Sequence, residues 1–160
     1  MKIAMVRIDE RLIHGQITMG WVRTVGADLI LVANDVVAMD SLQKKLMQLA
    51  SPPGVEVEIY AIDETAEKIS AQALPDKTIL ILVRNPVDFL RLVESGLSIK
   101  KVNVGGVRDP DARIKLTKEV SATDRELEAW KKLDQLGIRI EVQWVPGAST
   151  TVLNDVLRSH

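Results

Sequence analysis

The sequence predicts an α/β protein: an open, twisted, mostly parallel β-sheet with helices on both faces, formed by one domain over residues 1–160. Short runs rich in Val, Ile and Leu recur along the chain, and segments with helical signals separate them. Several of these runs are apolar at nearly every position, which is typical of strands covered on both faces. A length of 160 residues with 46% hydrophobic content suits a single core.

Six runs are expected to form the strands of this sheet. They are residues 3–8, 29–33, 55–62, 78–83, 102–104 and 138–145. The third and the last run (VEVEIYAI and IRIEVQWV) alternate partly between apolar and polar residues, so we expect them nearer the sheet edges. The stretch 105–122 breaks the rhythm and is predicted to be an irregular connection.

The first two helices are predicted from apolar spacing. Ile13, Ile17, Trp21 and Val25 recur every four residues, which indicates one buried helical stripe that Gly26 can end. The segment 41–50 (SLQKKLMQLA) places three leucines on one face before the breaker Pro-Pro-Gly; they are Leu42, Leu46 and Leu49.

The later helices are predicted from their starts. Asp63 is a suitable N-cap for the next helix, and Pro86 fits the first turn of the one after it. Thr123 and Glu126 have capping-box spacing ahead of a last helix that Gly137 can end.

Charge and composition exclude several classes of protein. Twenty-one basic residues stand against 22 acidic ones, and this balance argues against a nucleic-acid binder. The chain has no cysteine, which excludes disulfides and thiolate metal sites, and it contains only two histidines, so no metal site is expected. The N-terminus lacks a signal-peptide core and no run is long enough to span a membrane, so the expected location is the cytoplasm, with any membrane contact made through a partner.

Polar or small residues follow most of the predicted strands, where an open parallel sheet places its binding sites. The candidate residues are Asp9, Arg11, His14, Gly15, Gln16, Asp35, Arg84, Asn85, Gly105 and Gly106. Arginines, glycines and helix N-termini together favour a site for phosphate. Other interpretations stay open, because a pair of glycines often marks a bend and residues 34–35 (Asn-Asp) are also typical of a turn.

His14 is the candidate reactive group. It lies at the expected start of a helix, where free N–H groups favour an anion, and Arg11 lies in the same stretch. A neutral imidazole there can attack phosphorus, and Asp9 can fix its tautomer by accepting the proton of the other ring nitrogen. A histidine that only caps the helix, with surface ion pairs around it, is the competing interpretation.

The stretch RIDERLIHGQITMGW resembles the N-terminal signature of the IIB components of the mannose/fructose/sorbose family of the phosphoenolpyruvate-dependent sugar phosphotransferase system. The resemblance continues through LVANDVVAMD, ASPPGVEVEIYAIDE, ILVRNP and KKVNVGGV to ELEAWKKLDQLGIRIEVQWVP. It covers nearly the whole chain, and residues 105–122 match it least well.

The resemblance implies a phosphocarrier. His14 would accept a phosphoryl group on Nδ1 from a phosphohistidine of a IIA partner and pass it to a sugar entering through the membrane subunits IIC and IID. Arg11 and Asp9 match the family's arginine and aspartate. No cofactor is expected besides the covalent phosphohistidine, and the chain would be a free-standing IIB domain, peripheral to the membrane through the permease. The roles of Arg108 and Arg113 and the identity of the sugar are not specified by the resemblance.

Two further hypotheses stay open. One is a histidine-dependent phosphatase or phosphomutase acting on small phosphate esters, which would need a second acid in the pocket. The only other histidine is the terminal His160, which argues against it. The other is a non-catalytic ligand-binding or regulatory α/β module, which would need no nucleophile.

Overall fold

The computed structural model describes residues 1–160 and is built on a seven-stranded sheet with the strand order β10-β9-β5-β1-β4-β2-β3. Its strands are β1 (Lys2–Ile8), β2 (Leu29–Ala33), β3 (Glu56–Tyr60), β4 (Thr78–Val83), β5 (Lys101–Val104), β9 (Arg139–Val142) and β10 (Thr151–Val152). Every neighbouring pair is parallel except β9 and β10. The predicted fold class is therefore confirmed, and β3 forms one edge of the sheet as its alternating pattern suggested.

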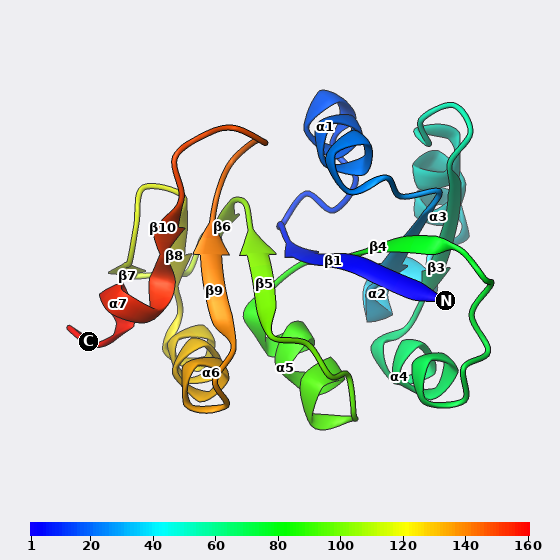
Figure 1. The fold of residues 1–160 in the computed structure, drawn as a ribbon. Helices are drawn as coiled ribbons and strands as arrows, with labels where there is room; N and C mark the ends of the chain where they lie inside the picture. The colour runs from blue at the N-terminus through cyan, green and yellow to red at the C-terminus, as the bar shows by residue number, and fades with distance from the viewer.

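Helices cover both faces of the sheet (Figure 1). They are α1 (Gly15–Val25), α2 (Asp35–Ala38), α3 (Ser41–Leu49), α4 (Ile62–Ser70), α5 (Pro86–Glu94), α6 (Asp124–Gln135) and α7 (Leu153–Leu157). Figure 1 shows α4, α5 and α6 along one face, with α1 on the opposite face and α3 beside the β3 edge. Each face has its own apolar core: 27 buried residues, among them Phe89 and Trp130, pack on the first, and 10, among them Trp21, pack on the second.

The helix ends follow the predicted signals with one exception. The capping box of Thr123 and Glu126 is complete at the start of α6, and Pro86 opens α5. Gly26 ends α1 in the left-handed conformation with φ 69°. The prediction for Asp63 is wrong, because α4 begins at Ile62, with Ala61 at the N-cap position, and places Asp63 in its first turn. An acidic side chain there interacts favourably with the helix dipole without capping.

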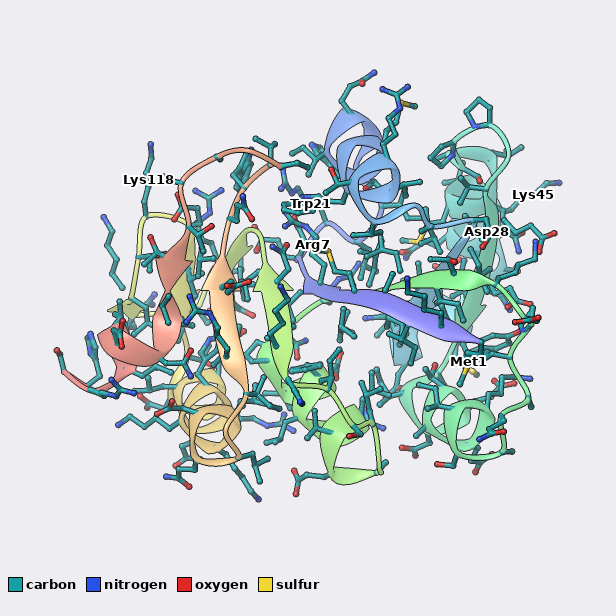
Figure 2. All side chains as sticks on the ribbon, in the orientation of Figure 1. Met1, Arg7, Trp21, Asp28, Lys45 and Lys118 are labelled. Atoms are coloured by element: carbon teal, nitrogen blue, oxygen red, sulfur yellow. The ribbon has the colours of Figure 1, made fainter.

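The leucines of α3 lie on one face, but this face points to solvent. The structure exposes seven large apolar side chains, and five of them lie between residues 36 and 49: Val36, Met39, Leu42, Leu46 and Leu49. We call these five residues the apolar stripe. Leu49 is 75% exposed, and α3 contains no fully buried residue. Figure 2 shows Lys45 of the same helix extending outward. The spacing of the leucines predicted that they share one face of the helix, but it did not predict whether that face points to the core or to solvent.

The stretch 105–122 is more regular than predicted. It contains three short strands, β6 (Val107–Arg108), β7 (Ile114–Lys115) and β8 (Val120–Ala122), which form a second sheet in the order β6-β8-β7. The longest has three residues, and such short strands leave no readable alternation in the sequence. The prediction of an irregular connection is therefore corrected.

Strand β1 lies near the middle of the main sheet, between β4 and β5. The loop that follows it is consequently flanked by the residues after β4 and after β5 at the carboxyl edge. None of the helices has the length and apolar composition that crossing a bilayer requires.

Candidate functional site

Residues 9–14 form a tight loop between β1 and α1, which we call the opening loop. Its backbone is bonded to both neighbouring strand ends: the Asp9 amide donates to the Val83 carbonyl at 2.9 Å, and the Glu10 amide donates to the Gly106 carbonyl at 2.9 Å. Leu12 has φ 55°, a left-handed conformation that a leucine rarely adopts, and its side chain is buried. The surrounding contacts therefore determine the shape of this loop.

A buried carboxylate between two arginines holds the opening loop together. Asp9 is only 2% exposed, and its Oδ2 lies 3.3 Å from Arg7 Nη2 and 3.0 Å from Arg11 Nη2. Its Oδ1 accepts hydrogen bonds from Arg11 Nε and from the Arg11 amide, both at 3.1 Å. Arg11 thus binds Asp9 in the paired, planar manner that a guanidinium favours.

Arg7 connects this cluster to the loop after β9. Its guanidinium donates to the carbonyls of Gln143 at 2.9 Å and Trp144 at 3.0 Å, and to the side chain of Asn103. It also lies over the ring of Trp21, 5.0 Å from the centroid, and Figure 2 shows these two side chains beside each other. Burial lowers the pKa of Arg7 to about 10, so the side chain stays charged at neutral pH.

The expected bond between Asp9 and the His14 imidazole is absent. Both oxygens of Asp9 accept from arginine donors, and the imidazole takes part in no hydrogen bond within the chain. A carboxylate that is already paired with two guanidinium groups is held where it is, because each bond is charge-assisted. The Asp9 interpretation is therefore corrected: in this structure the residue positions Arg7 and Arg11, and it does not set the tautomer of His14.

His14 is exposed and forms the N-cap of α1 through its backbone alone. Its carbonyl accepts from the amides of Ile17 at 3.1 Å and Thr18 at 3.3 Å, and its own amide donates to Thr18 Oγ1 at 2.7 Å. Gly15 and Gln16, the first two helical residues, have no earlier helical carbonyl to which their amides can donate. The first turn of α1 contains no acidic side chain, so this end of the helix can accept an anion.

Gly105 and Gly106 are explained by close packing. A Cβ atom at Gly105 would lie 2.3 Å from both Arg7 Nη2 and Asp9 Oδ2, so the arginine–aspartate cluster requires a glycine there. A Cβ atom at Gly106 would lie 3.2 Å from the Trp144 ring. Gly105 and Gly106 therefore lie beside the candidate site, as expected. In this structure, however, they leave room for side chains of the protein.

Of three further arginines near the carboxyl edge of the sheet, two bond to the opening loop and one does not. Arg84 Nε donates to the Glu10 carbonyl at 3.1 Å, and the Arg108 amide donates to the Glu10 carboxylate at 2.8 Å, so both residues support the opening loop. The Arg108 guanidinium also lies 6.0 Å from the centroid of the Trp144 ring. The Arg113 side chain forms one hydrogen bond, to the nearby Pro110 carbonyl at 3.5 Å.

Asp35 and Asn85 form no hydrogen bond with the opening loop. Asp35 accepts from Arg91 of α5 at 2.7 Å and from the Ile62 amide at 2.9 Å. The Arg91 bond, followed by the Ile62 bond, lowers the pKa of Asp35 below its ordinary value. Asn85 caps α5 by accepting from the Asp88 amide at 2.8 Å. In this structure both residues hold helices in place.

Sequence reasoning missed three contributors to the site. Thr18 holds the His14 backbone, Asn103 accepts from Arg7, and Trp144 lies against Arg11 with 4.3 Å between its ring centroid and the guanidinium carbon. The position of Thr18, four residues after His14, was a usable signal for a contact within one helical turn. The contacts of Asn103 and Trp144 depend on strand order, which the sequence does not display.

The fold and the opening loop together define an α/β protein that presents a functional loop at the carboxyl edge of a parallel sheet. The family model described as "PTS system sorbose subfamily IIB component" matches residues 3–160, and the chain belongs to this family.

Relatives and solved structures agree with this membership. The chain is 33% identical over 159 residues to the fructose-specific EIIB component of the PTS system of Bacillus subtilis, a match that covers 99% of this chain and 98% of that protein. The mannose-specific EIIAB component of Escherichia coli is 35% identical over 145 residues, which are 91% of this chain and 45% of that longer protein. The crystal structure of the IIB domain of the sorbose permease of Klebsiella pneumoniae superimposes with a TM-score of 0.92 at 31% identity, covering 99% of this chain and 98% of that one.

Proposed function

We propose that this protein is a phosphocarrier of a sugar phosphotransferase system and that His14 carries the phosphoryl group. The observation on which the proposal rests is the exposed imidazole of His14, free of hydrogen bonds, at the N-terminus of α1 and three residues after Arg11. Membership of the IIB family supports a role in sugar phosphotransfer.

The charges around His14 suit a transient phosphoryl group. The amides of Gly15 and Gln16 lie at the positive end of the helix dipole, where an anion is stabilised by typically 0.3–1 kcal/mol at an exposed site. Arg11 keeps Nη1 free of any partner within the chain while Nε and Nη2 bind Asp9. Because Asp9 already holds Arg11, we expect the loop to need little reorganisation when the negative charge arrives.

The transfer consists of two displacements at phosphorus. In the first, the unprotonated ring nitrogen of neutral His14 forms a P–N bond as the P–N bond of the donor phosphohistidine breaks. The donor nitrogen takes the electron pair, the donor ring takes up a proton to leave as neutral imidazole, and the phosphorylated His14 ring releases the proton on its other nitrogen. In the second, a sugar hydroxyl oxygen forms a P–O bond, the P–N bond at His14 breaks, and the hydroxyl proton passes to the departing imidazole or to solvent. The P–N bond supplies the transfer potential, so the proposed reaction needs no nucleotide or metal.

The proposed partners follow from the two displacements. The donor is a IIA protein, and the acceptor is a sugar held by the membrane subunits IIC and IID, so the protein would work in the cytoplasm and at the membrane surface. The name of the E. coli relative joins IIA and IIB in one component, which supports a IIA donor for this chain. An exposed histidine suits a carrier that must meet two different partners in turn.

Phosphorylation by the upstream proteins tests the proposal. We expect the protein, incubated with phosphoenolpyruvate and the phosphoryl-transfer proteins up to IIA, to gain one acid-labile phosphoryl group, detected by intact-protein mass spectrometry. His14→Ala should gain none, and His160→Ala should be labelled normally, because His160 is the only other histidine. Label on the His14→Ala protein, or none on the unaltered protein, would contradict the proposal.

The phosphatase alternative lacks a general acid near the loop. Asp9 is bound to two arginines, and Glu10 accepts from the Arg108 amide. Repeated turnover of a small phosphate ester such as p-nitrophenyl phosphate, without partner proteins, would favour that alternative.

A further inference from the structure

Trp144 stands apart from the other two tryptophans of the chain. Trp21 and Trp130 belong to the apolar cores on the two faces of the sheet, whereas Trp144 belongs to neither and is half-buried. It lies in the loop between β9 and β10, beside the opening loop. A large aromatic side chain outside the core needs another physical explanation.

The backbone around Trp144 is tightly held. Its carbonyl accepts from Arg7 at 3.0 Å and from the indole N–H of Trp21 at 3.4 Å. The preceding residue, Gln143, donates through its amide to Val104 at 2.9 Å and through its side chain to Ala148 at 2.9 Å. These contacts come from β1, from α1, from the neighbouring strand β5 and from within the loop, so the fold fixes the backbone from which the indole extends.

The Arg11 guanidinium lies over the Trp144 ring. The guanidinium carbon of Arg11 lies 4.3 Å from the ring centroid, well within cation–π range, and Arg108 lies farther away at 6.0 Å. Gly106 leaves room for the ring, because a Cβ atom there would approach it to 3.2 Å. Arg11 is thus held along one edge by Asp9 and against one face by Trp144.

These two contacts restrict different motions. The paired bonds to Asp9 fix the edge of the guanidinium in the plane of the carboxylate, but the group can still tilt about that edge. An aromatic ring against its face opposes the tilt. The remaining edge, which carries Nη1, has no partner in the chain and is free for an anion.

We propose that Trp144 is a positioning residue that orients Arg11 for phosphoryl transfer at His14. Trp144 acts through Arg11 and does not itself touch the reacting atoms. This inference rests on the proposed function of His14, because orientation of Arg11 matters only if a phosphoryl group arrives there. Removing the ring should let Arg11 tilt away and weaken transition-state stabilisation, while donor binding stays nearly unchanged.

Single-turnover transfer from the phosphorylated IIA donor tests the proposal. Trp144→Leu keeps an apolar side chain but removes the π-face. We expect the maximal transfer rate of this variant to fall roughly 5- to 30-fold, while the donor concentration that gives half of the maximal rate stays similar. Trp144→Phe keeps a ring and should restore most of the rate. The matched control is Tyr60→Leu, which removes a cation–π contact of similar length, 4.7 Å to Lys68, on the edge strand β3, and should transfer at the normal rate.

A second measurement follows Arg11 directly. In ¹⁵N-labelled protein the Arg11 Nε–H, bonded to Asp9 at 3.1 Å, should give a slowly exchanging NMR signal. We expect faster exchange in Trp144→Leu, a normal signal in Trp144→Phe, and unchanged circular dichroism in both. This measurement needs no donor, so it tests whether Trp144 holds Arg11 in place even if His14 proves not to be phosphorylated.

The outcomes separate the two proposals. A normal transfer rate in Trp144→Leu would overturn the positioning role. A slower rate accompanied by a normal Arg11 signal would also overturn it, because the slower transfer would then come from a change in the loop between β9 and β10 and not from Arg11. Absence of phosphorylation in the unaltered protein would overturn the function of His14 instead.

Discussion

At the scale of single residues, the site depends on a buried cation. Arg7 is 2% exposed and bonds to Asp9, to the Asn103 side chain and to two carbonyls of the loop after β9. A buried charge is tolerated only when most of its donors are paired, and here one carboxylate and three neutral oxygens do this. Removing the Asp9 carboxylate or the Asn103 amide would leave this buried charge with fewer partners, so Arg7 makes the opening loop sensitive to distant changes.

Gly105 should be the least replaceable glycine of the site. We expect Gly105→Ala to lower the free energy of unfolding by roughly 1–3 kcal/mol, because the new Cβ atom overlaps Arg7 and Asp9 at 2.3 Å. Urea unfolding followed by circular dichroism measures the change.

The matched control for this variant is Gly20→Ala. Gly20 lies inside α1, and its Cβ atom would make an ordinary contact with Pro146 at 3.5 Å. Alanine is the better helix former by about 0.5–1 kcal/mol, so this variant should be as stable as the unaltered protein or more so. Equal effects of the two substitutions would show that packing against the arginine–aspartate cluster is not what requires Gly105.

At the scale of elements, ion pairs and caps hold the helices at the carboxyl edge. Asp35 at the start of α2 joins Arg91 of α5 and the first amide of α4. Arg91 also reaches Asp63 at 3.1 Å, so one guanidinium connects three helices. These residues hold the helices in place and are not part of the site. A polar residue that follows a strand in the sequence can therefore have either a structural or a functional role.

Asp35→Asn should reduce stability in a pH-dependent manner. Because the Arg91 bond lowers the pKa of folded Asp35 below 3.8, its contribution is fully present above that pH and is lost as the pH falls through the lower folded value. At pH 7 we expect a loss of about 0.5–1 kcal/mol, kept small because the carboxylate is half exposed. Urea unfolding between pH 2 and pH 7 should show the two proteins converging in the acid range.

Asp63→Asn is the control, since Asp63 pairs with the same guanidinium but is 79% exposed. Its effect at pH 7 should be smaller than that of Asp35→Asn. If the free energies of unfolding of Asp35→Asn and the unaltered protein differed by the same amount at every pH, the charge of Asp35 would not be the source of its contribution.

The elements also show how far the sequence can be interpreted. Strands β2 and β4 were predicted with their observed bounds, because a run of buried apolar residues between polar ones has only one stable placement in a parallel sheet. The strands β6, β7 and β8 were not predicted, since two or three residues form no period. His14 and Arg11 were placed in one loop correctly, but the partner of Asp9 was not, because two arginines and a histidine compete for it and only tertiary geometry decides.

At the scale of the whole molecule, apolar surface is unevenly distributed. The apolar stripe gathers five of the seven large exposed apolar side chains near the β3 edge, while both faces of the sheet are covered. Stability should therefore come from the two cores and hardly at all from the stripe.

Paired substitutions test this distribution. Leu42→Gln and Leu49→Gln, at positions 67% and 75% exposed, should each change the free energy of unfolding by less than about 0.5 kcal/mol. Leu133→Ala, at a fully buried position of α6, should cost about 2–5 kcal/mol. Thermal unfolding checks both, and a large loss in either glutamine variant would show that α3 is packed more deeply than the structure indicates.

The bonds from Arg7 to Gln143 and Trp144 join residues 136 and 137 positions apart in the sequence. During synthesis, β1 and the opening loop leave the ribosome well before Gln143 and Trp144, whose carbonyl oxygens complete the Arg7 environment. Closing so long a span is entropically expensive and slow. A nascent chain that ends before β9 therefore contains His14 but lacks the framework around it, and the opening loop reaches its final shape only after residues 143 and 144 have been made.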